Sequence, residues 1–68
     1  MDNNILNIEE TVKYFEEAVE VGGLVSVAMI QRKFRVGYST AKRTLDKLIE
    51  LGHVGIKDDI RVMYYRKN

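Results

Sequence analysis

The stretch from residue 25 to residue 52 contains two helical patterns separated by a short break, and this feature restricts the possible fold most strongly. Apolar residues recur at helical spacing in the first pattern, at Val27, Ile30 and Phe34. The segment Arg35-Val36-Gly37-Tyr38 then interrupts the period, and Gly37 has the backbone freedom that a tight turn requires. Two short helices joined at a steep angle by a glycine-containing turn are typical of a helix-turn-helix.

Both helices have recognisable ends. Ser26 is the expected N-cap of a helix over residues 26–34, and Ser39 is the expected N-cap of a second helix over residues 39–51. Gly52 is expected to end the second helix. The buried stripe predicted for this helix contains four apolar residues, namely Ala41, Leu45, Leu48 and Ile49.

The residues before this stretch predict a further helix over 8–21, with apolar positions at Ile8, Val12, Phe15 and Val19. Asn7 is its expected N-cap, Gly22-Gly23 is its expected end, and residues 1–7 are expected to be frayed. Leu24-Val25 is either an edge strand or the apolar lead-in to the next helix.

After Gly52 the apolar period changes from helical to alternating. The residues Val54, Ile56, Ile60, Val62 and Tyr64 indicate two short strands over residues 53–65, joined around Asp58-Asp59. Tyr64 and Tyr65 point to opposite faces of the last strand, so one of them is expected to be buried. The sequence therefore predicts an α+β fold, a small winged helix-turn-helix. In this fold, three helices are followed by a short β-hairpin wing. Residues 1–68 are expected to form one domain.

Charge is distributed unevenly along the chain. Residues 31–47 carry six cations against the single acid Asp46, whereas the first twenty residues carry six acids against the single cation Lys13. The overall net charge of +1 conceals this separation. A cationic surface of this kind suggests a polyanionic partner.

Several function classes find no support in the sequence. There is no cysteine, and His53 is the only histidine, without clustered ligands at metal-binding spacing. No nucleophile–base pair or paired carboxylate is visible, so we expect no catalytic residues, no metal, no cofactor and no small-molecule substrate. No apolar run approaches the ~20 residues of a membrane span, and the acidic N-terminus does not resemble a secretion signal. A cytoplasmic location without membrane contact is therefore expected.

Residues 26–43, SVAMIQRKFRVGYSTAKR, resemble the gamma domain of FtsK/SpoIIIE-type bacterial DNA translocases. The pattern consists of a Ser-led helix ending in Gln-Arg-x-Phe-Arg, then a hydrophobic residue, Gly-Tyr, a small polar residue and Ala-x-Arg. In this chain the matching residues are Ser26, Gln31, Arg32, Phe34, Arg35, Val36, Gly37, Tyr38, Ser39, Ala41 and Arg43. The resemblance implies a winged helix that reads short oriented DNA sequences in the major groove and contacts the XerD recombinase. The chain has no nucleotide-binding P-loop, so it resembles this domain without its motor.

The resemblance and the charge pattern together give a set of candidate DNA-contacting residues. By position, the resemblance implies base reading by Ser39, Arg43 and Asp46, and it places Arg32 and Arg35 at basic positions beside the turn. Arginine can bond two acceptors on guanine, which makes Arg43 the leading base contact. Phosphate contacts are expected from four cations, namely Arg32, Lys33, Arg35 and Lys42. The remaining candidates, Thr40, Thr44 and Lys47, lie on the third helix.

Some of these residues have competing structural roles. Ser39 can cap its helix instead of, or as well as, contacting a base. Asp46 can accept from cytosine, or it can pair with Lys42 or Lys47, and pairing is the favoured interpretation. Tyr38 and Phe34 are expected in the core, where they would fix the angle between the two helices. Thr40 stands where the family usually has an arginine, so the DNA sequence that is read is expected to differ.

The predicted function is sequence-preferring binding of double-stranded DNA, in the role of a small regulator or a mobile-element or phage protein. Further partners considered are a tyrosine recombinase and additional copies of this chain on repeated sites. The alternative is a protein-interaction winged helix that binds an acidic partner or a recombinase rather than DNA.

Overall fold

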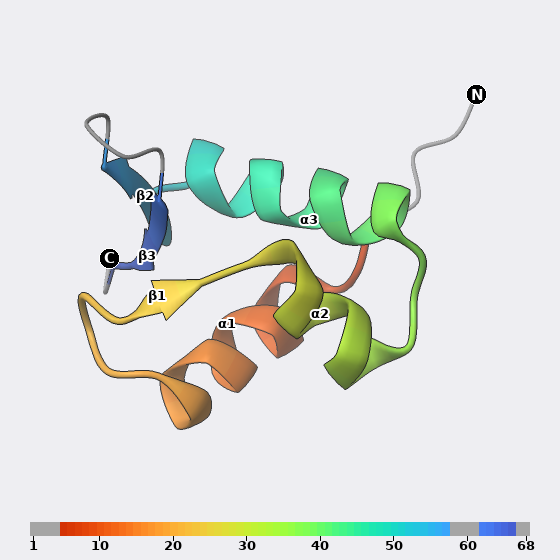
Figure 1. Cartoon of the computed structure of the whole chain (residues 1–68), viewed down its shortest axis with the longest axis horizontal. Coiled ribbons are helices and arrows are strands. Elements are labelled where there is room, and N and C mark those ends of the chain that lie inside the picture. The colour runs from red at the N-terminus through yellow and green to blue at the C-terminus, as the bar shows by residue number, and fades with distance from the viewer. Residues whose placement is uncertain (1–4, 58–61, 67–68) are drawn as a thin grey trace.

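The computed structural model describes residues 5–57 and 62–66. Within them the chain forms α1 (Ile8–Ala18), β1 (Leu24–Val25), α2 (Val27–Phe34), α3 (Tyr38–Glu50), β2 (Val54–Lys57) and β3 (Val62–Tyr65) (Figure 1). The three helices pack beside a small antiparallel sheet whose strand order is β1-β3-β2. This arrangement confirms the predicted α+β winged helix-turn-helix.

The segment Leu24-Val25 is an edge strand. Leu24 lies opposite Tyr64 and Val25 lies opposite Met63 in the antiparallel ladder with β3. The other half of the sheet is the predicted hairpin, in which Val54 pairs with Tyr65 and Lys57 with Val62. The predicted turn at Asp58-Asp59, together with Ile60, lies outside the described residues.

Helix α1 begins as predicted but ends earlier. The Asn7 side chain accepts a hydrogen bond from the Glu10 N–H at 2.9 Å, which confirms the N-cap. The helix ends at Ala18, and Val19 already has an extended backbone, so the predicted extension to residue 21 is wrong. The reason lies in the sheet. The Gly22 N–H donates to the Tyr65 carbonyl at 2.7 Å, and Gly22 turns the chain into β1 with φ +89°.

The turn between α2 and α3 uses a different residue from the one predicted. Ser26 caps α2 as expected, with its hydroxyl accepting from the Met29 N–H at 3.4 Å. Arg35 at the other end adopts the left-handed conformation, with φ 57° and ψ 48°. Gly37 has φ −74°, which any residue can adopt, so its predicted role as the flexible residue is wrong. The left-handed residue is needed directly after a helix, and Arg35 occupies that place.

Helix α3 begins two residues earlier than a Ser39 cap would require. Gly37 is the N-cap and makes no side-chain capping bond, and Ser39 lies exposed within the first turn. The predicted cap at Ser39 is therefore wrong. The C-terminal end follows the prediction, because Gly52 leaves the helix with φ +88°.

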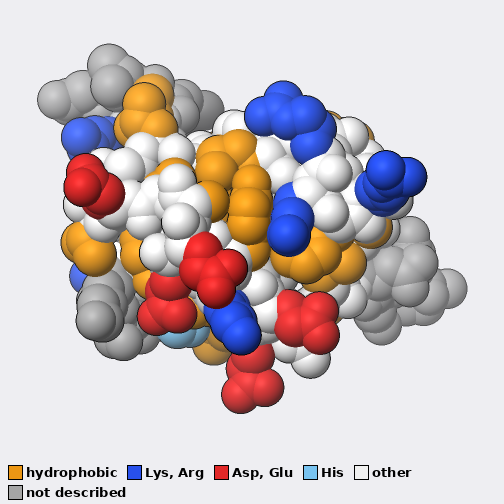
Figure 2. Space-filling model, turned by 90° about the horizontal axis from the view of Figure 1, so that it is seen from below, with side chains coloured by type: hydrophobic (Ala, Val, Ile, Leu, Met, Phe, Trp, Pro, Cys, Tyr) orange, Lys and Arg blue, Asp and Glu red, His pale blue; other side chains and the backbone are white. Residues whose placement is uncertain are grey.

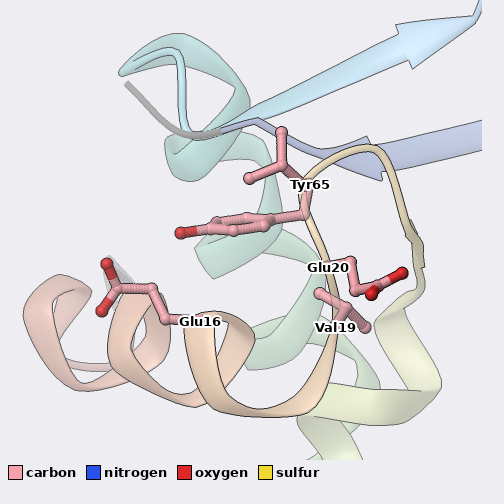
Figure 3. A pocket seen from close by; sticks show the side chains of 5 residues that line it. Glu16, Val19, Glu20 and Tyr65 are labelled. Atoms are coloured by element: carbon pink, nitrogen blue, oxygen red, sulfur yellow. The ribbon is translucent and has the colours of Figure 1, made fainter.

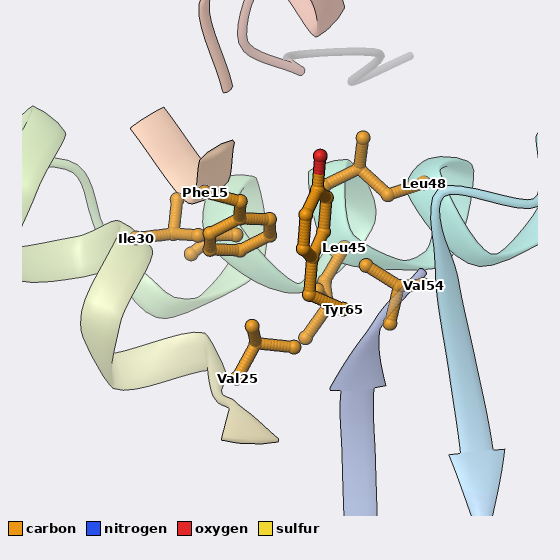
Figure 4. Close-up of a cluster of buried hydrophobic side chains, with 8 residues drawn as sticks. Phe15, Val25, Ile30, Leu45, Leu48, Val54 and Tyr65 are labelled. Atoms are coloured by element: carbon orange, nitrogen blue, oxygen red, sulfur yellow. The ribbon is translucent and has the colours of Figure 1, made fainter. Parts of the chain in front are cut away.

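One hydrophobic core holds the elements together (Figure 4). It contains Phe15, Val25, Ile30, Ala41, Leu45, Leu48, Val54 and Tyr65. Tyr65 is therefore the buried member of the tyrosine pair, and Tyr64 is half-buried. Phe34 packs against this core as expected and meets the Tyr14 ring edge-on, with the two centroids 5.8 Å apart. The expectation for Tyr38 is wrong, because its side chain is 59% exposed.

We predict that Arg35→Gly raises the free energy of unfolding by about 0.5–1 kcal/mol. Glycine removes a left-handed penalty of roughly 1–2 kcal/mol, partly offset by the greater freedom of glycine in the unfolded chain. Chemical denaturation of the two chains measures this difference. A less stable variant would contradict the assignment of the left-handed position.

The matched substitution Gly37→Ser tests the other half of the turn. No atom lies within 4 Å of a Cβ added at Gly37, and a serine there can cap α3. We expect the free energy of unfolding to rise by roughly 0.5–1 kcal/mol, since serine also restricts the unfolded chain. If the turn needed the flexibility of Gly37, the substitution would lower the free energy of unfolding instead.

We also predict an alkaline loss of stability that depends on Tyr65. Burial raises the pKa of the Tyr65 phenol above its ordinary value of 10.0, and the charge of Glu16 raises it further. The folded state therefore favours the protonated phenol. This stabilisation is fully present below pH 10.0 and is lost as the pH rises through the folded-state pKa. Chemical denaturation at about pH 8 and about pH 11 measures the free energy of unfolding at each pH. It should fall less between the two for Tyr65→Phe than for the parent chain, and an equal decrease in both would contradict the prediction.

Candidate nucleic-acid interface

Helix α3 lies along one side of the molecule, with one face in the core and the other in solvent (Figure 1). Its buried residues are Ala41, Thr44, Leu45 and Leu48. Ser39, Lys42 and Asp46 are exposed, whereas Thr40, Arg43 and Lys47 are half-buried. The 13 residues of this helix make it about 20 Å long, and its width suits a major groove that is about 12 Å wide.

The structure corrects the position of Thr44. Thr44 was predicted to be a DNA-contacting residue, but its side chain is fully buried, so this prediction is wrong. Its hydroxyl donates to the Thr40 carbonyl at 2.8 Å and accepts from the Leu6 N–H at 2.9 Å. Thr44 therefore ties the segment before α1 to α3. The helical spacing from Ala41 to Leu48 includes position 44, so the periodicity itself contained this signal.

The exposed side of α3 carries two internal ion pairs. The Lys42 ammonium lies 2.9 and 3.0 Å from the two carboxylate oxygens of Asp46, which confirms the favoured interpretation of Asp46. This hydrogen bond raises the pKa of Lys42 above its ordinary value, and the charge of Asp46 adds to the effect. Lys47 pairs with Glu50 at 3.4 Å. Exposed pairs of this spacing contribute only about 0.3–0.5 kcal/mol, so a DNA phosphate can replace the carboxylate at little cost.

Three further cations lie at the end of α2 and in the turn. Arg32, Lys33 and Arg35 are all exposed, and the Lys33 ammonium lies 5.6 Å from the centroid of the Tyr14 ring. This cation–π contact orients Lys33 without covering its charge. These cations directly precede the start of α3 in the chain. Gly37 is the N-cap of α3 and has no side chain with which to bond the N–H groups of the first turn. Backbone N–H groups at such a helix start can bind phosphate.

The exposed acids outside α3 occupy a separate surface. Glu9, Glu10, Glu16, Glu17 and Glu20 are all exposed, and they lie on α1 or directly after it. Figure 2 shows most of the acidic side chains over the lower part of the visible face, with one Lys or Arg side chain among them, and several Lys and Arg side chains over its upper right part. The charge separation along the sequence is thus also a separation in space.

The profile of the FtsK gamma domain family matches residues 9–62, which is most of the chain. The chain belongs to the FtsK gamma domain family. The DNA translocase SpoIIIE of Bacillus subtilis is 46% identical over 50 residues, and the DNA translocase FtsK of Sporosarcina ureae has the same identity over the same length. The DNA translocase FtsK of Clostridium acetobutylicum is 39% identical over 51 residues.

These alignments cover 69%, 69% and 75% of this chain, respectively, but only 6% of each translocase. No solved structure matches the chain. The match confirms the resemblance that residues 26–43 indicate, and it agrees with the winged-helix fold of the chain. In the described residues, no helix is long and apolar enough to cross a bilayer.

Sequence reasoning missed Tyr38 as a member of this surface. It is the first residue of α3, it is exposed, and it lies one helical turn before Lys42. The period break at residues 35–38 hides the fact that Tyr38 is already helical, so its exposure is not visible in the sequence pattern.

We predict that Asp46→Asn strengthens binding to duplex DNA of any sequence by several-fold at low salt. The substitution releases Lys42 from its ion pair and removes a negative charge from the α3 surface. Fluorescence anisotropy with two unrelated duplexes measures the effect. A change in which sequence is preferred, without a general increase in affinity, would indicate that Asp46 reads a base.

Proposed function

We propose that this chain binds double-stranded DNA with a sequence preference, by placing α3 in the major groove. The observation that carries the proposal is the arrangement of charge on the fold. Exposed or half-exposed cations of α3 follow directly after three exposed cations of α2 and the turn. The two acids of α3, Asp46 and Glu50, are paired with its lysines, and five exposed glutamates lie on α1 or directly after it. The family supports DNA as the polyanion.

The proposed roles divide the residues into two groups. Arg43 reads guanine, and Ser39 contacts a neighbouring base, since neither residue is buried. Thr40 and Lys47 flank these positions on α3. The phosphate contacts come from the cations Arg32, Lys33, Arg35 and Lys42. Asp46 modulates Lys42 through the ion pair, and Thr44 is left out because it is buried.

A single module with these contacts binds weakly. Occupancy in a cell would then require repeated sites with further copies of the chain, or a partner such as a tyrosine recombinase. We infer a cytoplasmic location because DNA is the proposed ligand. We also propose that the chain acts as a small regulator on bacterial or phage DNA. The alternative, an acidic protein or a recombinase on the same surface, predicts that no duplex is bound.

Selection of bound duplexes from a random pool tests the proposal and yields the preferred sequence. With about four phosphate contacts, log affinity should fall against log salt with a slope near −4. Binding that does not depend on salt, or a pool without enrichment, would contradict the proposal.

We predict that Arg43→Ala weakens binding to the selected sequence by roughly 1–3 kcal/mol and binding to an unrelated duplex much less. Lys33→Ala should weaken both by the same factor and reduce the salt slope by about 1. Lys13→Ala is the matched control, because it removes one positive charge from the acidic helix α1. Anisotropy titrations at several salt concentrations measure all three variants. Equal effects of Arg43→Ala and Lys13→Ala would refute the base contact.

A further inference from the structure

A pocket of about 270 Å³ lies between the C-terminal part of α1 with the residues after it and the end of β3 (Figure 3). Its lining consists of two acids, two valines and one aromatic residue, namely Glu16, Glu20, Val19, Val21 and Tyr65. Small-molecule sites have volumes of about 300–1,000 Å³, so this pocket is better matched to one amino-acid side chain.

The Tyr65 hydroxyl is a polar group that the fold leaves available. Tyr65 is only 3% exposed, and its hydroxyl points along the pocket toward the side on which Glu16 lies (Figure 3). Among the described residues it has no hydrogen-bond partner. No buried side-chain oxygen of the described residues lacks a partner, so the Tyr65 oxygen, which has none, is open to solvent through the pocket. A ligand that enters the pocket can therefore reach it.

The pocket has a negative potential and apolar walls. Glu16 lies beyond the hydroxyl end of the Tyr65 ring, and Glu20 lies near its other end (Figure 3). In the described part of the chain, neither carboxylate has an ion-pair partner. Val21 is 63% exposed, which leaves an apolar surface at the rim. The phenol of Tyr65 is neutral at physiological pH, and its oxygen can accept a hydrogen bond there.

We propose that this pocket binds a lysine or arginine side chain from a different protein. The aliphatic part of that side chain lies along Val19, Val21 and the Tyr65 ring. Its cationic head donates hydrogen bonds to the Glu16 carboxylate and the Tyr65 oxygen, and Glu20 adds attraction from the other end of the ring. Long basic side chains have this combination of an apolar stem and a charged head.

The proposal does not rest on DNA binding, and the two surfaces are separate. Helices α1 and α3 lie on different sides of the molecule (Figure 1), so the pocket stays accessible when α3 contacts a ligand. A duplex cannot itself enter the pocket, because its phosphates are repelled by Glu16 and Glu20. A second copy could offer only its own cations, and the chain would then associate with itself.

The experiment uses the full chain without DNA and four capped tripeptides, Gly-X-Gly, with lysine, arginine, norleucine or citrulline at X. The lysine and arginine peptides should shift the amide NMR signals of residues 16–21 and 65 in a saturable manner. We expect them to bind about tenfold more tightly than their uncharged counterparts, because hydrogen bonds between charged groups are the stronger ones. Equal binding of norleucine and lysine peptides would overturn the proposal.

Matched variants separate the pocket from a diffuse acidic surface. Glu16→Gln should weaken binding of the cationic peptides about tenfold and Tyr65→Phe several-fold. Glu17→Gln should leave the affinity unchanged, because Glu17 is the exposed neighbour that does not line the pocket. If Glu16→Gln and Glu17→Gln lowered the affinity for the cationic peptides equally, the binding would reflect general attraction to an acidic surface. That result would overturn the proposal. Analytical ultracentrifugation could instead show that the chain self-associates and that Glu16→Gln abolishes the association. A second copy of the chain would then be the occupant of the pocket, and the proposal of a different protein would be overturned.

Discussion

The burial of one side of α3 is the interaction on which the rest of the structure depends. Leu45 and Leu48 are fully buried in a core that also contains Phe15, Val54 and Tyr65. Burying a side chain of this size contributes about 1.5–3 kcal/mol, whereas an ion pair on the exposed side of α3 contributes about 0.3–0.5 kcal/mol. The core therefore decides the rotation of α3 about its axis. The surface charges only occupy the face that this rotation turns outward.

The turn before α3 combines a geometric requirement with a functional one. A left-handed residue after α2 directs the chain into α3, and an arginine occupies it at a cost of roughly 1–2 kcal/mol relative to an ordinary helical conformation. A glycine would meet the geometric requirement with less strain, but it would remove a cation from the surface proposed to contact DNA. The proposed DNA surface gives the charge of Arg35 a use that its conformational preference does not, and strained residues often coincide with binding surfaces.

Two oppositely charged surfaces can coexist on so small a molecule because solvent screens one from the other. Charge interactions decay over about 8–10 Å at physiological salt, whereas the molecule extends over 32 × 25 × 20 Å. The glutamates of α1 therefore weaken the attraction of the α2–α3 cations for a phosphate backbone only slightly. The glutamates also repel phosphates, so the pocket proposed for a cationic side chain and the surface proposed for DNA attract ligands of opposite charge.

The sequence by itself determined the features that depend on neighbouring residues. Periodicity and capping residues predicted α2, the start of α1 and most of α3, the charge pattern located the cations, and residues 26–43 indicated the family. Only the tertiary structure decided where α1 ends, because pairing of Gly22 with β3 draws the chain out of the helix. It also decided that Tyr38 lies outside and that Tyr65 rather than Tyr64 enters the core. The periodicity already puts Thr44 on the buried face of α3, but not its hydrogen bond with Leu6. Local spacing reports which side chains share a face, but what that face meets depends on segments distant in the chain, as the contact of Thr44 with Leu6 shows.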